Sequence, residues 1–290
     1  MKLKIIDETF FQGLEQLDIY LKDNIAGAFG GNHKSEKTGS SSEFADYREY
    51  IPGDDIRKID WNVFSRFEKL YLKLFLDERQ MHHRIYIDGS KSMENKKTFA
   101  LKIAVAFGYL AVKAMDKVSI YVIQDHKNYK VLDGVVGKQS FYNLVAKIDD
   151  IEFKGESHIS DGILYSSTGY GNGMSVIISD FLTDNDYKKA INYLKDKHRD
   201  ITCIQVLSDE EINPIYSGKS ILYDVENSNK MYKKNIKKEH LKAYKMALDY
   251  IRNDIESFCN SRQANYLFAS TSDSINKLIL NDSIKKEIVK

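Results

Sequence analysis

The sequence contains few of the residues that mark specialised protein classes. It has two cysteines, two prolines and one tryptophan in 290 residues. So few cysteines cannot build a disulfide-rich scaffold, and so few prolines exclude collagen-like and proline-rich disordered chains. Cys203 and Cys259 each stand in an apolar, periodic segment. We therefore expect two buried, reduced thiols, which fit a reducing compartment.

An excess of one charge and a long apolar run are also absent. The 43 Lys and Arg residues balance 42 Asp and Glu residues, for a formal net charge of +1. This balance argues against nucleic acid or an anionic membrane as a partner. Residues 99–112 are the most apolar stretch, but they contain Lys102 and fall short of the roughly 20 residues of a membrane span. Acidic residues also interrupt the first apolar segment, so no secretory signal is evident and we expect a cytoplasmic protein.

The first 80 residues differ in pattern from the rest of the chain. Apolar positions at helical spacing predict an amphipathic helix over residues 5–25, and residues 30–43, which lack apolar side chains, predict a flexible loop. A turn signature and then a period-two strand pattern at residues 70–76 follow. We expect residues 1–80 to form a small N-terminal elaboration, with Trp61 as a core aromatic of a packed subdomain.

Apolar strands alternate with helices over residues 81–290. The patterns predict strands at residues 84–88, 118–123, 174–179, 201–207 and 265–269, separated by helices. This alternation is typical of an α/β domain with a doubly wound, mostly parallel sheet. The strands at 84–88 and 174–179 show no polar alternation, so we expect them to be central and parallel to each other.

Small polar residues follow two of these predicted strands. Asp88, Ser90 and Ser92 follow the first, Asp180 follows the strand at 174–179, and Ser157 lies in a loop between them. In open α/β sheets, ligands bind beyond the carboxyl ends of the strands, so we expect these five side chains to surround one site. Their hard oxygen donors suit Mg²⁺ or Mn²⁺.

The serine hydroxyls of this site have two possible roles, as metal ligands or as helix caps. Because they are neutral, they leave the charge of a bound dication largely uncancelled, so the metal can accept a carboxylate from another molecule. The alternative is that Ser90 and Ser92 only cap the helix that follows them.

The same residues resemble a known metal site. Residues 88–92, DGSKS, resemble the D-x-S-x-S signature of the metal-ion-dependent adhesion site in von Willebrand factor A domains. The loop at residues 155–161 is similar to the one that supplies that site's threonine, with Ser157 in its place. Ser179 and Asp180 resemble the strand end that supplies the second aspartate. The resemblance implies a von Willebrand factor A-like fold with a divalent-cation site.

A second resemblance lies before the first predicted strand of the sheet. The string R-x-Y-x-P-G-D-D-x-R-x-I-D-W resembles the hallmark of the bacterial family catalogued as domain of unknown function 58. The residues that carry it are Arg48, Tyr50, Pro52, Gly53, Asp54, Asp55, Arg57, Asp60 and Trp61. Genes of that family commonly lie beside those of MoxR-type AAA+ ATPases, which implies a partnership in protein maturation or complex assembly. The charged members of the string could lock the subdomain onto the sheet or form a contact surface for the ATPase.

Two classes of function remain after these observations. The first is a non-enzymatic module that uses a bound divalent cation to engage an acidic residue of a protein ligand, such as the ATPase or its client. The alternative is an Mg²⁺-dependent phosphohydrolase of the haloacid-dehalogenase type, whose first strand also ends in an aspartate. That chemistry needs a second carboxylate two residues later as the acid/base, where this chain has Ser90. We therefore expect no catalytic turnover.

Three histidines lie near these features and predict no metal site by themselves. His82 and His83 are adjacent, so they cannot form the helical i, i+4 pair that binds zinc, and we interpret them as a surface feature. His158, beside Ser157, is expected to face solvent. Asp161 could accept hydrogen bonds near the metal loop or merely begin a helix.

Overall fold

The computed structural model describes residues 8–20, 34–35, 44–50, 56, 59–75, 77–78, 80–145, 148–166, 168–169, 171, 173–182, 187–216, 218–223 and 231–289. The chain divides into two compact units. The larger unit comprises Met1–Leu21 and Met81–Lys290, and the smaller unit comprises Lys22–Gln80. Among the described residues, no helix combines the length and apolar character needed to cross a membrane.

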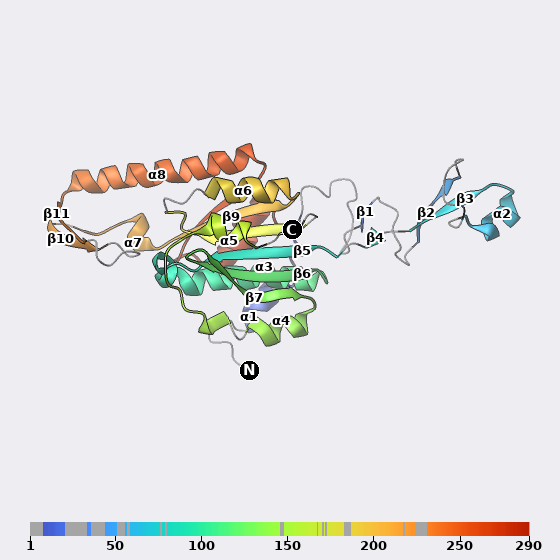
Figure 1. Ribbon diagram of the computed structural model, residues 1–290, viewed down its shortest axis with the longest axis horizontal. Helices are drawn as coiled ribbons and strands as arrows, with labels where there is room; N and C mark the ends of the chain where they lie inside the picture. The colour runs from blue at the N-terminus through green and yellow to red at the C-terminus, as the bar shows by residue number, and fades with distance from the viewer. Residues whose placement is uncertain are drawn as a thin grey trace. The chain divides into compact units, whose positions relative to one another are not determined.

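A six-stranded sheet forms the centre of the larger unit (Figure 1). Its strands in chain order are β5 (His82–Asp88), β6 (Lys117–Gln124), β7 (Lys127–Val135), β8 (Met174–Ser179), β9 (Asp200–Leu207) and β12 (Asn265–Ser270). Their spatial order is β12-β9-β8-β5-β6-β7. All neighbours are parallel except β7, which pairs antiparallel with β6 at one edge. The predicted doubly wound, mostly parallel sheet is confirmed, as is the parallel pairing of β5 with β8.

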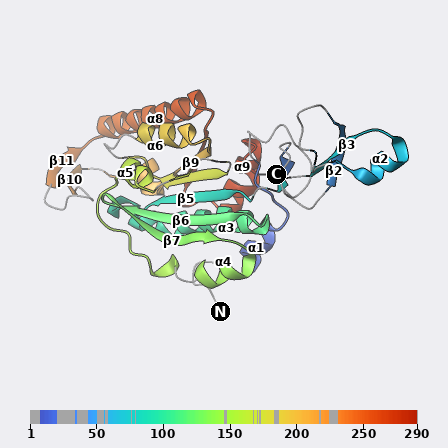
Figure 2. The same ribbon diagram turned by 45° about the vertical axis from the view of Figure 1, so that its right-hand side comes forward.

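Helices cover both faces of this sheet (Figures 1 and 2). One face carries α1 (Glu8–Leu14), α3 (Lys97–Lys113) and α4 (Lys138–Val145), and the other carries α5 (Ile159–Leu164), α6 (Tyr187–Asp196) and α8 (Lys238–Ser261). Side chains alternate along β5, so Ile85 and Ile87 join the first core while Tyr86 joins the second. Because α1 and α4 pack on α3, that helix is buried nearly all round, as its largely apolar sequence predicts.

Shorter elements complete the larger unit. They are η3 (Lys91–Lys96), η4 (Ile148–Asp150), α7 (Asp209–Ile212), β10 (Gly218–Tyr223), β11 (Met231–Ile236), the π-helix η5 (Lys277–Asp282) and α9 (Ser283–Lys285). Strands β10 and β11 form an antiparallel hairpin at the N-terminal end of α8 (Figure 1). The pattern of residues 231–236 gave no strand prediction, because these side chains are exposed on both faces of the hairpin.

The N-terminal helix is shorter than its apolar spacing predicts. The helix α1 ends at Leu14, and the backbone of Ile19 forms an isolated antiparallel bridge with Val289. Leu17 and Ile19 remain buried in the same core as α3. Lys113 Nζ also donates to the carbonyl of Leu17 at 2.8 Å. Tertiary pairing with the chain's last residues therefore replaces the helix while keeping its apolar positions buried.

The described residues of the smaller unit form two short antiparallel sheets. In one, β2 (Phe44–Glu49) pairs with β3 (Tyr71–Phe75), and in the other β1 (Lys34–Ser35) pairs with β4 (Asp77–Glu78). Between β2 and β3 lies α2 (Trp61–Phe67), whose N-cap is Asp60. Asp60 Oδ1 accepts from the backbone N–H of Asn62 at 2.9 Å, and Asp60 Oδ2 accepts from Tyr47 Oη at 2.8 Å. This motif residue therefore joins α2 to β2.

The prediction that Trp61 is a core aromatic is wrong. Trp61 is 60% exposed, and its ring makes an edge contact with Phe64 at 6.0 Å between centroids. Among the described residues of the smaller unit, the buried apolar ones are Ile59 and Leu72, which also bridge through their backbones. Trp61 begins a helix with no buried residue, so its position on α2 turns it away from this small core.

Much of the family motif lies outside the described residues. These positions are Pro52, Gly53, Asp54, Asp55 and Arg57. Arg48 contributes its backbone to β2, opposite Leu72. The expected ion-pair network therefore stays a prediction.

The adjacent histidines belong to the sheet, so their interpretation as a surface feature is wrong. His83 is 2% exposed, its Nε2 lies 3.1 Å from Asp116 Oδ2, and its Nδ1 accepts from the Met174 N–H at 3.1 Å. His82 is half-buried, with its Nε2 2.8 Å from Ser119 Oγ. The strand β5 begins at His82 because this segment pairs with Lys117 and Val118 of β6.

Stability should depend on the protonation of His82. Burial, followed by the charges of Arg84 and Arg199, lowers the pKa of His82 from 6.5 to about 4. Between pH 6.5 and about pH 4 the unfolded chain protonates His82, whereas the folded protein keeps it neutral. The contribution of neutral His82 to the free energy of unfolding is therefore complete above pH 6.5 and is lost as the pH falls toward 4. We expect His82→Gln to lose less stability than the wild type between pH 7 and pH 4.5, measured by urea unfolding. A difference in stability that stays constant over this range would contradict the assignment.

Candidate metal centre

The five predicted site residues lie at the carboxyl ends of β5 and β8, where the order of the strands reverses. Asp88 is the last residue of β5, and Asp180 directly follows β8. Ser90 and Ser92 belong to the turn and the η3 helix after β5, and Ser157 precedes α5. The parallel pairing of β5 with β8 brings their ends to one edge of the sheet.

Hydrogen bonds connect these five residues. Ser157 Oγ donates to Asp88 Oδ2 at 2.7 Å, and the Ser90 N–H donates to Asp88 Oδ1 at 3.0 Å. Ser90 Oγ lies 3.1 Å from Ser92 Oγ, and Ser92 Oγ donates to Asp180 Oδ2 at 2.9 Å. The structure thus places two carboxylates and three hydroxyls in one cluster.

The side chains of Ser90 and Ser92 bond to other residues of the site. Ser90 occupies the N-cap of η3, all of whose residues are described, yet its side chain makes no capping hydrogen bond there. Its hydroxyl contacts Ser92, and the Ser92 hydroxyl in turn contacts Asp180. The Ser92 hydroxyl therefore binds a carboxylate of the site, and the interpretation of Ser90 as a side-chain cap is contradicted.

Two glycines allow the loops of the site to approach closely. A Cβ at Gly89 would lie 2.4 Å from a side-chain carbon of β6, and the Gly89 carbonyl accepts from the Lys154 N–H at 2.8 Å. Gly155 has φ +80°, and a Cβ there would lie 2.3 Å from Asp125 Oδ1. The Gly155 carbonyl accepts from the Lys91 N–H at 3.0 Å. These contacts hold the loop of Ser157 against the turn after β5.

The aspartates are buried close to each other. Asp88 and Asp180 are each 1% exposed. Burial and then the charge of Asp180 raise the pKa of Asp88, against hydrogen bonds from Ser179, Ser157 and the Ser90 N–H that lower it. Ser179 Oγ donates to Asp88 Oδ2 at 2.7 Å, a contact that the sequence does not predict. A cation would relieve the repulsion between the two carboxylates.

A buried lysine is the second unpredicted member of the site. Lys96 is 1% exposed, and its Nζ lies 2.9 Å from Asp180 Oδ2 and 2.6 Å from Glu211 Oε1. Burial alone lowers the pKa of Lys96, but the charges of the two carboxylates outweigh it, so the pKa is raised and the ammonium stays charged. Sequence does not distinguish Lys96 from the nearby Lys91 and Lys97.

Glu211 is positioned by a motif that the sequence does contain. Its N–H donates to Ser208 Oγ at 3.3 Å, while Glu211 Oε2 accepts from the Ser208 N–H at 2.8 Å. This is the capping box of α7, visible as S-x-x-E. Its remaining oxygen is the one that binds Lys96. The motif predicts a helix start but not the ion pair across the site.

The donor set fits a hard divalent cation. Asp88, Asp180 and the three serines offer only oxygen atoms, which suit Mg²⁺ or Mn²⁺. The site already accommodates one positive charge, because the Lys96 ammonium forms an ion pair with Asp180. With Glu211, the ionised cluster carries three negative charges and one positive charge, a net of −2 that a dication would offset.

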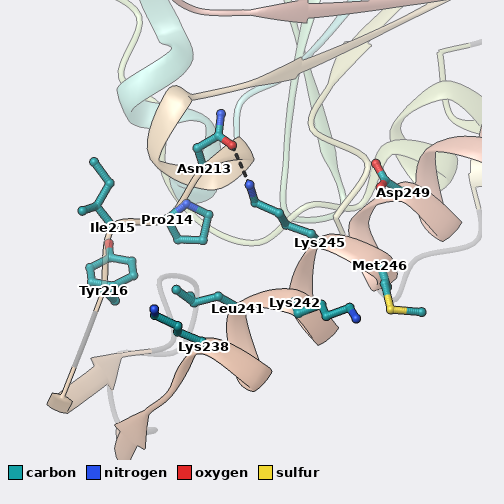
Figure 3. A pocket seen from close by; sticks show the side chains of 10 residues that line it. All are labelled: Asn213, Pro214, Ile215, Tyr216, Lys238, Leu241, Lys242, Lys245, Met246 and Asp249. Carbon is teal, nitrogen blue, oxygen red and sulfur yellow. Dashed lines mark hydrogen bonds between the residues drawn. The ribbon is translucent and has the colours of Figure 1, made fainter.

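A separate groove lies between the segment after α7 and the first turns of α8 (Figure 3). Its volume is about 600 Å³. The lining residues are Asn213, Pro214, Ile215, Tyr216, Lys238, Leu241, Lys242, Lys245, Met246 and Asp249. Lys245 Nζ donates to Asn213 Oδ1 at 2.9 Å across the groove. None of the five site residues lines it, so the groove and the metal centre are distinct features.

The comparisons with known proteins give relatives in mycobacteria and structural neighbours of low similarity. Uncharacterized protein Rv1480 of Mycobacterium tuberculosis and Uncharacterized protein Mb1516 of Mycobacterium bovis are each 23% identical to this chain over 234 residues, which cover 77% of this chain and 73% of each relative. The von Willebrand factor A domain of SpRpn10 matches at 12% identity, with a TM-score of 0.39, over 71% of this chain and 96% of that domain. Proximal thread matrix protein 1 from the mussel byssus matches at 13% identity, with a TM-score of 0.40, over 73% of this chain and 46% of that chain.

A match to a family model shows which protein family the chain belongs to. The family described as protein of unknown function DUF58 matches residues 46–250. This span contains the whole motif before the sheet and both strands that end at the candidate metal centre. It covers more than half of the chain, and the protein therefore belongs to the DUF58 family.

Proposed function

We propose that this protein is a non-enzymatic interaction module that binds a divalent cation, Mg²⁺ or Mn²⁺, and uses it to engage an acidic residue of a protein ligand. The ligands of the cation would be Asp88, Ser90, Ser92, Ser157 and Asp180. The observation that carries this proposal is the hydrogen-bonded cluster of their oxygens at the point where the strand order reverses.

The chain's own residues hold the two carboxylates in fixed orientations. Ser179 and the Ser90 N–H bind Asp88, while the Leu182 N–H donates to Asp180 Oδ1 at 3.0 Å. Gln205 Nε2 also donates to the Asp180 carbonyl at 2.7 Å, which anchors the end of β8. A bound cation would supply open coordination positions for an incoming carboxylate. Preorganisation of this kind lowers the entropic cost of binding.

The phosphohydrolase alternative receives no comparable support. An aspartate nucleophile needs a nearby acid/base, and the position two residues after Asp88 holds Ser90. Glu211, which reaches the cluster through Lys96, is paired with the Lys96 ammonium. We therefore retain a binding function rather than a catalytic one.

A MoxR-type AAA+ ATPase, or a client delivered to it, is the first partner to test. This choice rests on the gene neighbourhood implied by the family resemblance. The smaller unit offers a further contact surface in the exposed side chains of Ile56, Trp61, Phe64 and Phe67. Exposed aromatic residues are enriched among those that dominate protein interfaces.

Binding of the purified ATPase should require both the metal and Asp180. We expect its affinity to fall by at least about tenfold, or 1.4 kcal/mol, when Mg²⁺ is chelated or when Asp180 is replaced by Asn. Biolayer interferometry on the full chain measures this. Trp61→Ser serves as a matched variant of the aromatic surface. Association that survives both chelation and Asp180→Asn but is lost in Trp61→Ser would show that docking uses the smaller unit instead.

A further inference from the structure

A second group of side chains with metal-ligating atoms lies beside the loop that carries Ser157. It consists of His126, in the turn between β6 and β7, His158, directly after Ser157, and Asp161, in the first turn of α5. His126 Nδ1 lies 2.9 Å from Asp161 Oδ2, and the centroids of the two imidazole rings are 3.9 Å apart. One donor atom from each of the three side chains lies within 4.8 Å of the other two.

We propose that His126, His158 and Asp161 form a binding site for a borderline divalent transition metal of the Zn²⁺ class. Imidazole nitrogens suit Zn²⁺, Cu²⁺ and Ni²⁺, whereas sites with oxygen ligands alone suit Mg²⁺. Metal–ligand bonds of about 2.0–2.2 Å in a tetrahedral site place neighbouring donor atoms roughly 3.3–3.5 Å apart. His126 Nδ1 and Asp161 Oδ2 are 2.9 Å apart and all three donor atoms lie within 4.8 Å of one another, so side-chain rotations would be needed to bring them to one ion.

The backbone holds the two loops that carry these ligands together. The Asp125 N–H donates to the Glu156 carbonyl at 3.0 Å, and the Glu156 N–H donates to Asp125 Oδ1 at 2.9 Å. The Gly162 N–H also donates to the His158 carbonyl at 3.0 Å. His126 and His158 therefore keep their relative positions without a metal, which reduces the ordering cost of binding one.

The surroundings also agree with a metal site. Glu156 Oε2 lies 3.4 Å from His158 Nε2, and a carboxylate beside a histidine ligand orients the ring and raises its basicity. The His158 side chain is 22% exposed and that of His126 is 65% exposed, so an ion can enter from solvent. Three protein ligands leave a fourth position, which water or a donor from another protein can occupy.

This site differs from the candidate metal centre in position and in chemistry. The hydrogen bonds that connect Asp88 with Asp180 use none of its three side chains. Its two nitrogen ligands select a different class of metal from the oxygen-only cluster. Because Ser157 and His158 are adjacent, one loop would carry a ligand of each metal. The inference does not depend on the proposed function, since Zn²⁺ binding is measured directly.

The test is a Zn²⁺ titration of the tag-free full chain after removal of metals with a chelator. We expect one strong Zn²⁺ site in the wild type, retained in Asp88→Ala, and weakened by more than about 100-fold in His126→Ala and in His158→Ala. Co²⁺ in the same site should show the visible absorption bands of tetrahedral coordination. His240→Ala removes an exposed histidine from the first turn of α8, outside the proposed site, and is the matched control.

Two results would overturn the inference. One is Zn²⁺ affinity in the His126→Ala/His158→Ala double variant equal to that of the wild type. The other is loss of Zn²⁺ binding in Asp88→Ala with no loss in the histidine variants, which would place the ion in the oxygen cluster. All four substituted positions can be checked for folding by thermal unfolding without metal, and His126 and His158 are not core residues.

Discussion

Replacing Asp88 with alanine should abolish Mg²⁺ binding while leaving the fold largely intact. Asp88 supplies one of two carboxylates in the cluster and accepts hydrogen bonds from Ser157, Ser179 and the Ser90 N–H. Loss of a direct charged ligand should weaken Mg²⁺ binding by more than the roughly 10–100-fold that loss of an indirect contact costs. Titration calorimetry on the full chain measures the affinity, and circular dichroism checks the fold.

Two further variants make this result specific. Asp88→Asn keeps the size of the side chain and removes the charge, so it should also lose Mg²⁺ binding. Asp133→Ala is the matched control, because Asp133 is an exposed carboxylate on β7 that pairs with Lys130. Unchanged Mg²⁺ affinity in both Asp88 variants would refute the assignment of the metal centre.

Replacing Lys96 with methionine should destabilise the metal-free protein strongly. Asp180 would stay buried after losing the ammonium that lies 2.9 Å from its Oδ2. Breaking a buried ion pair by removing one partner costs about 3–5 kcal/mol, because an uncompensated charge remains. Urea unfolding of the wild type and of Lys96→Met, both without metal, measures this loss of unfolding free energy.

Magnesium should restore part of that stability. Without the ammonium, the carboxylates of Asp88, Asp180 and Glu211 no longer share their charge with an internal cation, so Mg²⁺ should bind Lys96→Met more tightly than the wild type. A ligand at 100 times its Kd adds about 2.7 kcal/mol of stability. Lys91→Met removes an exposed lysine from the same helix and should change neither property. A loss of stability in Lys96→Met that Mg²⁺ leaves unchanged would show that the ammonium and the metal do not share the site.

The charge balance of the site explains how it can fold before any metal binds. Two buried aspartates would repel each other, and the Lys96 ammonium offsets part of that repulsion. Glu211 in turn holds the ammonium from α7. The metal would add to this arrangement rather than create it.

The sequence by itself determined the sheet and the cluster at its edge. The apolar runs at residues 84–88 and 174–179 have no polar alternation, and such strands are stable only when helices cover both faces. Parallel strands end at the same edge, so Asp88 and Asp180 had to lie near each other once those strands were neighbours. This reasoning needs only the order of residues along the chain.

Only the tertiary structure decided which charged groups are buried and what they contact. Lys96 resembles its neighbouring lysines in sequence, and its burial depends on the positions of β8 and α7, which supply Asp180 and Glu211. In the same way, His83 is buried and its imidazole contacts Asp116, a residue 33 positions later in the chain. Trp61 is exposed because it begins a helix outside the small core. Ion pairs and burial arise between segments far apart in the chain, and local residue patterns contain no information about those distances.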